Sequence, residues 1–429
     1  MKKISICILI LLAFACKKNQ KKEPIVHTTP KIINAEYIAG KTRYFSVKNE
    51  AVQGEGRAWL ERMFEESQFV VFGERHNSKE TSKLIEALIP IMHTSGFETL
   101  CLEIGPNSAV KLTELMAPAQ NTVENLRSFN TKYYHETLDR VPIPFFAGVE
   151  DALFLKAAAQ NNMQIWGLDQ EYFYAILFLT DELLKQAQGA DNFSEIQNSK
   201  QKADSIILKW LIKENTSNED IDIFTEILQE PTVDTFFNYF RGSDTPGGKI
   251  VKDLEISWDI YSRWRQDSHV DRISYMRNNF KDRYHSYVKE NGAPPKVFLK
   301  FGQLHTSRKL SNGAYDLGHL TASLAKEKGL VSTSINSWTR YYLENGEEID
   351  YLEKYYNYYK RLKLFMEVAK RDQWTLIDLR SIREDILNNK VRLPENGDFH
   401  KMNALIQGYD IQLILPLDTF ITPNREIKD

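Results

Sequence analysis

Short apolar segments recur along the chain, and amphipathic segments lie between them. The apolar runs are Phe69–Phe72, Thr99–Leu102, Gln164–Trp166, Lys296–Leu299, Val331–Ile335, Trp374–Ile377 and Ile411–Leu415. Continuous apolar runs of this length, bounded by turn residues, are typical of strands that are buried on both faces of a sheet. Helical patterns separate several of them, for example Glu80–His93 and Thr321–Lys328. The alternation predicts an α/β fold with a mostly parallel, doubly wound sheet.

One long, charged segment interrupts this alternation. From about 172 to 287 the pattern is helical and contains few strand signals. We predict a large helical insertion that covers the strand ends, so that residues 49–429 form a single α/β domain. Within it, Trp258, Tyr261 and Trp264 are three residues apart, a spacing that favours a packing stripe on one helix face.

The amino terminus has the pattern of a secretory signal peptide. Lys2 and Lys3 precede an apolar run about half as long as the roughly 20 residues that a membrane-spanning helix needs. The run ends in Ala13-Phe14-Ala15-Cys16, which resembles a bacterial lipobox. We therefore predict a signal peptide over 1–15, followed over 16–48 by a lipidated Cys16 and a flexible tether. The alternative is an ordinary signal peptide followed by an incidental cysteine.

This leader predicts a protein of the bacterial cell envelope, held extracytoplasmically on the periplasmic face or the cell surface by its lipid anchor.

The charge balance is nearly neutral, with 55 Lys and Arg against 58 Asp and Glu and a formal net charge of −3. Loss of Lys2 and Lys3 with the leader makes it −5. No basic excess suggests nucleic acid as a partner.

Cysteine usage excludes a disulfide scaffold, because the chain has only three cysteines in 429 residues. Cys7 lies in the predicted leader and Cys16 at the predicted lipidation site. Cys101 lies in an apolar run, where a buried and inert thiol is the expected role.

Polar residues follow four of the predicted strands. Glu74 and His76 follow the first, and Glu103, Asp169 and His305 follow three later ones. In open α/β sheets, functional sites form beyond the carboxyl ends of the strands. Glu74 and His76 are two residues apart and would project to the same side of an extended chain. We therefore predict that these five residues share one functional site.

In this order the motifs resemble those of the superfamily that joins erythromycin esterase, the ChaN haem-uptake lipoproteins and the Tiki proteases. The resemblance spans roughly residues 60–420. The single residue between Glu74 and His76 resembles ChaN, because the esterases have one more. The similar segments are Gly73-Glu74-Arg75-His76, Gly96-Phe97 leading to Glu103, Gly167-Leu168-Asp169-Gln170, the helix with Arg272 and Met276, Phe301-Gly302-Gln303-Leu304-His305, Trp374–Arg380 and Tyr409–Pro416.

The esterase resemblance implies a hydrolase in which water cleaves an ester or lactone of a small-molecule substrate. His76 or His305 would be the general base, and Glu74 or Glu103 would orient the imidazole and raise its basicity. The other histidine or Arg272 would stabilise charge on the attacked carbonyl oxygen. The chain has no Gly-x-Ser-x-Gly elbow, which favours water over a covalent nucleophile.

Two alternatives use the same region differently. Glu74, His76, Glu103 and His305 are suitable ligands for Zn²⁺, Mn²⁺ or Fe²⁺ with an open position for water, as in a Tiki-like metal-dependent hydrolase. The ChaN resemblance instead implies a lipoprotein that binds haem for iron uptake, through a tyrosine. The candidate tyrosines are Tyr133, Tyr134, Tyr355, Tyr356, Tyr358 and Tyr359.

Overall fold

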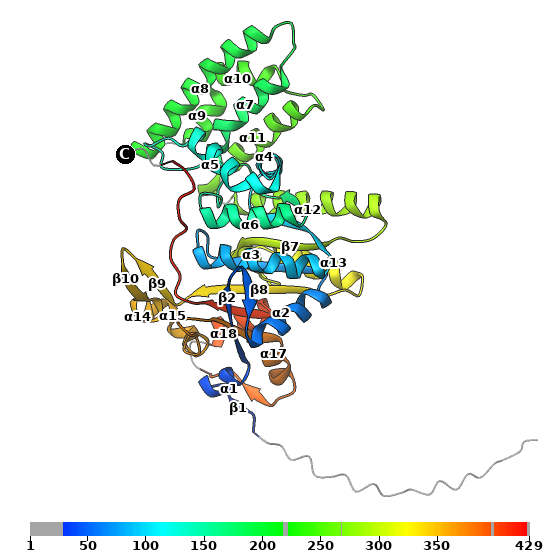
Figure 1. The fold of residues 1–429 in the computed structure, drawn as a ribbon, viewed down its shortest axis with the longest axis vertical. Coiled ribbons are helices and arrows are strands. Elements are labelled where there is room, and N and C mark those ends of the chain that lie inside the picture. Colours follow the sequence, from blue (N-terminus) through cyan, green and yellow to red (C-terminus); the bar gives the residue numbers. More distant parts are fainter. Residues whose placement is uncertain (1–28, 218–221, 267, 396–398, 427–429) are drawn as a thin grey trace, which may run out of the picture.

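The computed structural model describes residues 29–217, 222–266, 268–395 and 399–426 (Figure 1). The predicted signal peptide and the predicted lipidation at Cys16 lie outside these residues. Within them, no helix has the length and apolar character that crossing a membrane requires.

A mostly parallel sheet organises the fold, as predicted. Its strands are β2 (Thr42–Lys48), β3 (Ala51–Gln53), β4 (Phe69–Glu74), β5 (Phe97–Leu102), β6 (Gln164–Gly167), β7 (Lys296–Gly302), β8 (Ser332–Thr339), β11 (Trp374–Asp378) and β13 (Ile411–Leu415). In the described part of the chain they form one nine-stranded sheet in the order β3-β2-β11-β13-β8-β4-β7-β5-β6 (Figure 1). Strands β13 to β6 are parallel, whereas β11, β2 and β3 pair antiparallel.

Every apolar run predicted as a strand lies in this sheet. Two small pairs, β1 (Lys31–Ile32) with β12 (Val391–Arg392) and β9 (Tyr341–Glu344) with β10 (Glu347–Asp350), are separate from it. The predicted fold class is therefore confirmed, with an antiparallel edge that the apolar pattern did not indicate.

Helices cover both faces of the sheet. Those before β6 and after β7 are α1 (Ala35–Gly40), α2 (Glu55–Glu66), α3 (Lys79–Thr94), α4 (Pro106–Leu115), α5 (Thr122–Tyr133), α6 (Val149–Gln160), α13 (Leu317–Glu327), α14 (Tyr351–Lys354), α15 (Tyr356–Tyr359), α16 (Lys363–Met366), α17 (Leu379–Leu387) and α18 (Phe399–Gly408). Short 3₁₀ turns occur at η1 (Ala119–Asn121), η4 (Gln303–His305) and η5 (Lys360–Leu362).

The segment between β6 and β7 contains helices and no strand among its described residues. Its elements are η2 (Phe173–Ala175), α7 (Ile176–Gln186), α8 (Phe193–Thr216), α9 (Ile223–Gln229), α10 (Pro231–Asn238), α11 (Pro246–Ser262), η3 (Trp264–Gln266) and α12 (His269–Asn291). Figure 1 shows α7 to α11 gathered at one end of the molecule, while α12 lies closer to the sheet. Trp258 is buried in the core, but Trp264 is 70% exposed, so the predicted packing stripe was wrong at its last position.

The two faces of β4 enter two different hydrophobic clusters because successive side chains of a strand point to opposite sides. Val70 and Phe72 belong to one cluster, and Phe69 and Val71 belong to the other. All of β4 is buried, which explains its unbroken apolar run. Cys101 is also fully buried in the second cluster, and burial raises the pKa of its thiol well above the usual value.

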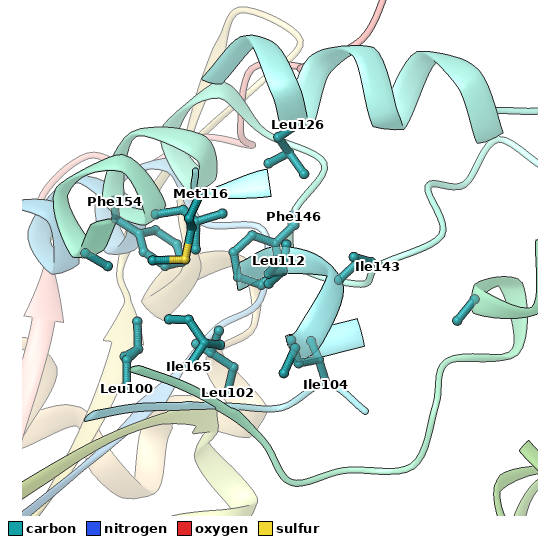
Figure 2. Packing of buried hydrophobic residues seen from close by; sticks show 14 of the residues in the cluster. Leu100, Leu102, Ile104, Leu112, Met116, Leu126, Ile143, Phe146, Phe154 and Ile165 are labelled. Atoms are coloured by element: carbon teal, nitrogen blue, oxygen red, sulfur yellow. The ribbon is translucent and has the colours of Figure 1, made fainter. Parts of the chain in front are cut away.

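Figure 2 shows how the first cluster joins the sheet to the helices above it. Leu100 and Leu102 of β5 and Ile165 of β6 face Leu112 of α4 and Phe154 of α6. This packing holds α4 and α6 against one face of the sheet.

The tether predicted over 16–48 is wrong for its described part. Residues from Lys31 onwards form β1, α1 and β2, and β2 pairs with β11. Ile38 and Phe45 are fully buried, and the Phe45 ring stacks on Trp374 with centroids 5.8 Å apart. Isolated apolar residues in a polar stretch thus anchor this segment to the sheet edge, where burial of each large side chain contributes about 1.5–3 kcal/mol.

Candidate functional site

Three buried carboxylates gather at one edge of the sheet. Glu74 is the last residue of β4, Glu103 follows β5, and Asp169 lies two residues after β6. Because parallel strands end at the same edge, these residues from separate parts of the sequence lie close together. Each is no more than 5% exposed, so each carboxylate needs hydrogen-bonding partners.

Glu103 is the central member of this group. The Gly302 backbone N–H donates to its Oε2 over 2.6 Å, and Arg272 Nη2 donates to its Oε1 over 2.9 Å. His305 Nε2 lies 3.4 Å from Oε1, and His76 Nε2 lies 3.7 Å from Oε2. Both predicted histidines therefore contact the same carboxylate, and residues from four strands and one helix form a single cluster.

His76 is held on two sides. Its Nδ1 lies 3.1 Å from Glu74 Oε1, and its ring stacks on Phe145 with centroids 3.9 Å apart. Lys300 Nζ donates to the same Glu74 oxygen over 2.6 Å. Burial opposes ionisation of Glu74, but Lys300 and His76 outweigh it and lower its pKa. An ionised carboxylate only accepts, so His76 Nδ1 donates and its Nε2 carries the lone pair when the ring is neutral.

His305 is in a different state. Its Nδ1 is 2.6 Å from Asp316 Oδ2, and Glu103 lies at its other nitrogen. Burial disfavours the charged ring, but Glu103 and Asp316 raise its pKa to about 10. At neutral pH, His305 is therefore an imidazolium, so its ring has no free lone pair with which to act as a base.

Glu103 and Arg272, which form a salt bridge, complete the charge balance of the cluster. Burial raises the pKa of Glu103, yet His305, His76 and Arg272 outweigh it and hold the pKa well below the usual value. Arg272 Nε donates to Asp169 Oδ1 over 2.9 Å, and its pKa stays well above normal despite burial because Asp169 and Glu103 face it. Asp169 thus positions Arg272, and His305 together with Arg272 keeps Glu103 ionised.

Three residues of this cluster were not predicted from the sequence. Lys300 had a readable signal, since it lies between Leu299 and Phe301 inside a buried strand, where a lysine is rarely found without a partner. Asp316 caps α13, as many aspartates do, and nothing in the sequence indicates that it also binds His305. Phe145 has a positive φ of 64° in a loop and follows no recognisable pattern.

Two glycines allow the close packing of this edge. A Cβ at Gly302 would lie 2.9 Å from His76 Nε2, so any side chain there would displace the imidazole. A Cβ at Gly73 would lie 2.4 Å from Thr306 Oγ1 and 2.9 Å from Gln303 Cα. Gly73 thus lets the turn that bears His305 pack against β4.

A cavity of about 690 Å³ opens above Glu103, Asp169 and Arg272. This volume suits a small organic ligand. Much of the wall is aromatic, and the aromatic residues that line it are Tyr134, Phe145, Tyr172, Phe173, Tyr261 and Phe420. Phe145 links the cavity to His76, because Phe145 lines the cavity and its ring stacks on the His76 imidazole.

One wall of the cavity comes from the end of the chain, Thr419–Arg425, which we call the C-terminal strap. Figure 1 shows this segment leaving the sheet and running along the helices. The Thr422 N–H donates to Glu150 Oε2 and the Asn424 N–H to the carbonyl of Ala147, each over 2.8 Å. The strap residues that line the cavity are Phe420, Ile421, Pro423 and Arg425. No sequence pattern predicted this wall.

The donor set does not fit a divalent metal ion. Among the described residues, no group of three or more His, Cys, Asp or Glu side chains is arranged to hold one. The carboxylates predicted as ligands already face cations, with Lys300 on Glu74 and Arg272 on Glu103.

Of the six tyrosines predicted as haem ligands, one lines the cavity above Glu103 and five do not. Tyr134 lines the cavity, but its hydroxyl donates to Asp139 over 2.9 Å and the Arg425 guanidinium lies 3.7 Å from its ring centroid. The remaining candidates, Tyr133, Tyr355, Tyr356, Tyr358 and Tyr359, do not line it.

Fold and site together define an α/β protein with a histidine–carboxylate cluster at the carboxyl edge of a mostly parallel sheet. This is the fold of erythromycin esterase. A mutant of erythromycin esterase EreC in its open conformation superposes with a TM-score of 0.52 and 12% identity, covering 88% of this chain and 98% of that chain. No protein-family model and no curated protein matches the sequence.

Other solved structures share the fold. A succinoglycan biosynthesis protein superposes with a TM-score of 0.53 and 13% identity over 90% of this chain and 97% of its own. A Bacillus cereus protein has a TM-score of 0.50 and 16% identity over 91% and 98% of the two chains. ChaN of Campylobacter jejuni, solved with cofacial haem, has a TM-score of only 0.28 and 12% identity over 70% of this chain and 91% of that chain. At such identities the likeness establishes the fold.

Proposed function

We propose that this protein is a hydrolase that cleaves an ester or a lactone by general-base activation of water, with His76 as the base. The observation that supports this most directly is the environment of His76. Ionised Glu74 fixes its Nδ1–H, Phe145 fixes the plane of its ring, and its Nε2 lies 3.7 Å from Glu103, which lines the cavity.

In the proposed reaction, His76 Nε2 takes a proton from water while the water oxygen attacks the substrate carbonyl carbon. The negative charge that develops on the carbonyl oxygen is stabilised by the His305 imidazolium and Arg272. When the tetrahedral intermediate collapses, the C–O bond to the alkoxide breaks and His76 returns its proton to that oxygen. Glu103 lies between both imidazoles and stabilises the positive charge that His76 acquires.

The first test is hydrolysis of a panel of p-nitrophenyl esters and lactones. We expect His76→Gln to lower kcat/KM by at least about 100-fold, because a positioned general base contributes roughly 10²–10⁴-fold. His93→Gln is the matched control, since His93 is exposed in the last turn of α3 and should leave the rate unchanged. Equal rates for His76→Gln and the native protein would refute the assignment of the base.

The same preparations separate the competing functions. We expect dialysis against EDTA to leave ester hydrolysis intact, because the carboxylates already face Lys300 and Arg272. Loss of activity that one added metal restores would favour a metal-dependent hydrolase instead. A haem Soret band that disappears in Tyr134→Phe, in a protein that hydrolyses none of the panel, would favour a haem-binding function.

The aromatic wall should affect catalysis and binding separately. Phe145→Ala is expected to lower kcat by about 2- to 10-fold, because an aromatic stacking contact contributes roughly 0.5–1.5 kcal/mol and here it orients the base. Phe420→Ala, on the strap, is expected to raise KM for long acyl chains without changing kcat, since Phe420 lines the cavity. Steady-state kinetics on esters of increasing length measure both; the same effect from both variants would contradict the orienting role of Phe145.

A further inference from the structure

A second cavity, of about 710 Å³, lies beside the amino-terminal end of β8, between α13 and α17. It shares no lining residue with the cavity above Glu103. Its wall is rich in cationic side chains and contains a single carboxylate among the described residues, Asp410. We call it the basic pocket; its basic residues are Arg308, Lys309, His319, Lys326, Arg380 and Arg383.

The one carboxylate is already neutralised and serves to hold the arginines in place. Asp410 is 1% exposed, accepts from the Ser334 N–H over 3.0 Å and pairs with both Arg308 and Arg383. Arg383 also donates to the carbonyl of Ile406 over 2.8 Å. These contacts fix two guanidinium groups at the pocket wall, so that little side-chain entropy is lost when they bind a ligand.

The pocket keeps an excess of positive charge after this pairing. Lys309 and Lys326 are exposed and form no ion pair within the described residues. Arg380 is fixed by Asp378, with Nε 3.1 Å from Oδ1. Burial lowers the pKa of the His319 imidazole, and so do the positive charges of Arg277 and Lys309.

We propose that the basic pocket binds a phosphate-bearing anion. Guanidinium groups match the oxygen geometry of phosphate, and the two unpaired lysines add point charges. The volume exceeds that of a single phosphate and leaves room for an organic part. The exposed Tyr315 ring, whose centroid lies 4.4 Å from that of His319, offers an aromatic surface at the edge of the pocket.

The site is independent of the hydrolase proposal, so either can fail alone. The source of the phosphate is a free organic phosphate or the headgroup of an anionic lipid, and two probes distinguish them. The soluble probe is inositol hexakisphosphate, followed by isothermal titration calorimetry with the whole protein. The membrane probe is sedimentation with vesicles of phosphatidylcholine, with and without phosphatidylglycerol.

The test variant is Lys309→Glu with Lys326→Glu, because both lysines are exposed and unpaired and should not disturb folding. The control is Lys202→Glu with Lys209→Glu, which makes the same change in net charge on exposed positions of α8. We expect the first pair to weaken binding of one probe by at least about tenfold, since each charge-assisted contact is among the stronger hydrogen bonds. The control pair should leave affinity within about twofold at the ionic strength of the cell, where distant charges are screened.

If inositol hexakisphosphate binds, and the Lys309→Glu, Lys326→Glu pair weakens that binding, the pocket is assigned to a soluble organic phosphate. Binding of the phosphatidylglycerol vesicles alone assigns it to a lipid headgroup. Equal weakening by both pairs of substitutions would show attraction by net charge alone and overturn the proposal. Absence of measurable binding of either probe to the native protein would overturn it as well.

Discussion

Glu103→Gln is expected to reduce ester hydrolysis by about 10²- to 10⁴-fold, the contribution of a charged group that serves general-base catalysis. Glu103 contacts both imidazoles, Arg272 and the Gly302 N–H through its two oxygens. A neutral amide at this position cannot stabilise the imidazolium that His76 becomes. Its NH₂ group would also face cationic or N–H donors, so at least one contact would be lost.

The pH profile gives this prediction a second readout. In the native protein the pKa of His305 is raised to about 10, so catalysis that needs the protonated ring persists through neutral pH and is lost as the pH rises through about 10. Glu103 is the largest of the influences that raise this pKa. In Glu103→Gln the pKa must fall, and the residual activity should decline at lower pH than in the native protein.

The control for this variant is Glu98→Gln, an exposed residue of β5, the strand that Glu103 follows. It should leave both the rate and the pH profile unchanged. The rate of Glu103→Gln is interpreted only if urea unfolds this variant as cooperatively as it unfolds the native protein in the same experiment. A properly folded Glu103→Gln enzyme with near-native activity, or with an unchanged alkaline limb, would show that Glu103 has no part in the reaction.

The strands of the parallel sheet could be predicted because a strand that is buried on both faces has a continuous apolar sequence. Phe69–Phe72 is apolar throughout since each side of β4 enters a different cluster. The antiparallel edge has no such continuous apolar run. Strand β2 is only partly buried, and Phe45 is its one buried residue, in a largely polar segment. Isolated anchors of this kind cannot be separated from linker residues by local pattern.

The candidate site was predictable as far as strand ends determine it. Glu74, Glu103 and Asp169 follow parallel strands, so topology alone brings them to one edge. The state of each group was not predictable, because it depends on contacts between distant parts of the chain. Asp316 pairs with His305, and this contact helps to keep His305 protonated; the sequence left open which histidine was the base.

Lys300→Met is expected to lower the free energy of unfolding by about 3–5 kcal/mol at neutral pH, the usual effect of removing one member of a buried ion pair. Lys300 and Glu74 are 5% and 4% exposed, and the lysine donates to Glu74 over 2.6 Å. Burial favours the neutral form of Glu74, and Lys300 is the largest influence that opposes it. Without Lys300, the pKa of Glu74 rises, and at neutral pH its ionised form is a buried charge without its main cationic partner, which destabilises the folded state.

The sign of the pH dependence follows from this. In the native protein the lowered pKa of Glu74 stabilises the fold above the unfolded-state pKa, and this stabilisation is lost as the pH falls through the folded-state pKa. In Lys300→Met the folded-state pKa lies above the unfolded one. The deficit in stability should therefore be largest at neutral pH and shrink under mildly acidic conditions, where Glu74 is protonated without penalty.

Urea unfolding of four proteins measures this effect: the native chain, Lys300→Met, Glu74→Gln and the double variant. The double variant should recover most of the loss, because replacing both members leaves no uncompensated charge between β4 and β7. Asp151 also faces Lys300, and burial raises the pKa of this aspartate to about 7, so it becomes neutral at little cost when the lysine is absent. Additive losses in the double variant, or a deficit in Lys300→Met that is the same at neutral and acidic pH, would mean that Lys300 stabilises the strand by packing its alkyl chain and not by its charge.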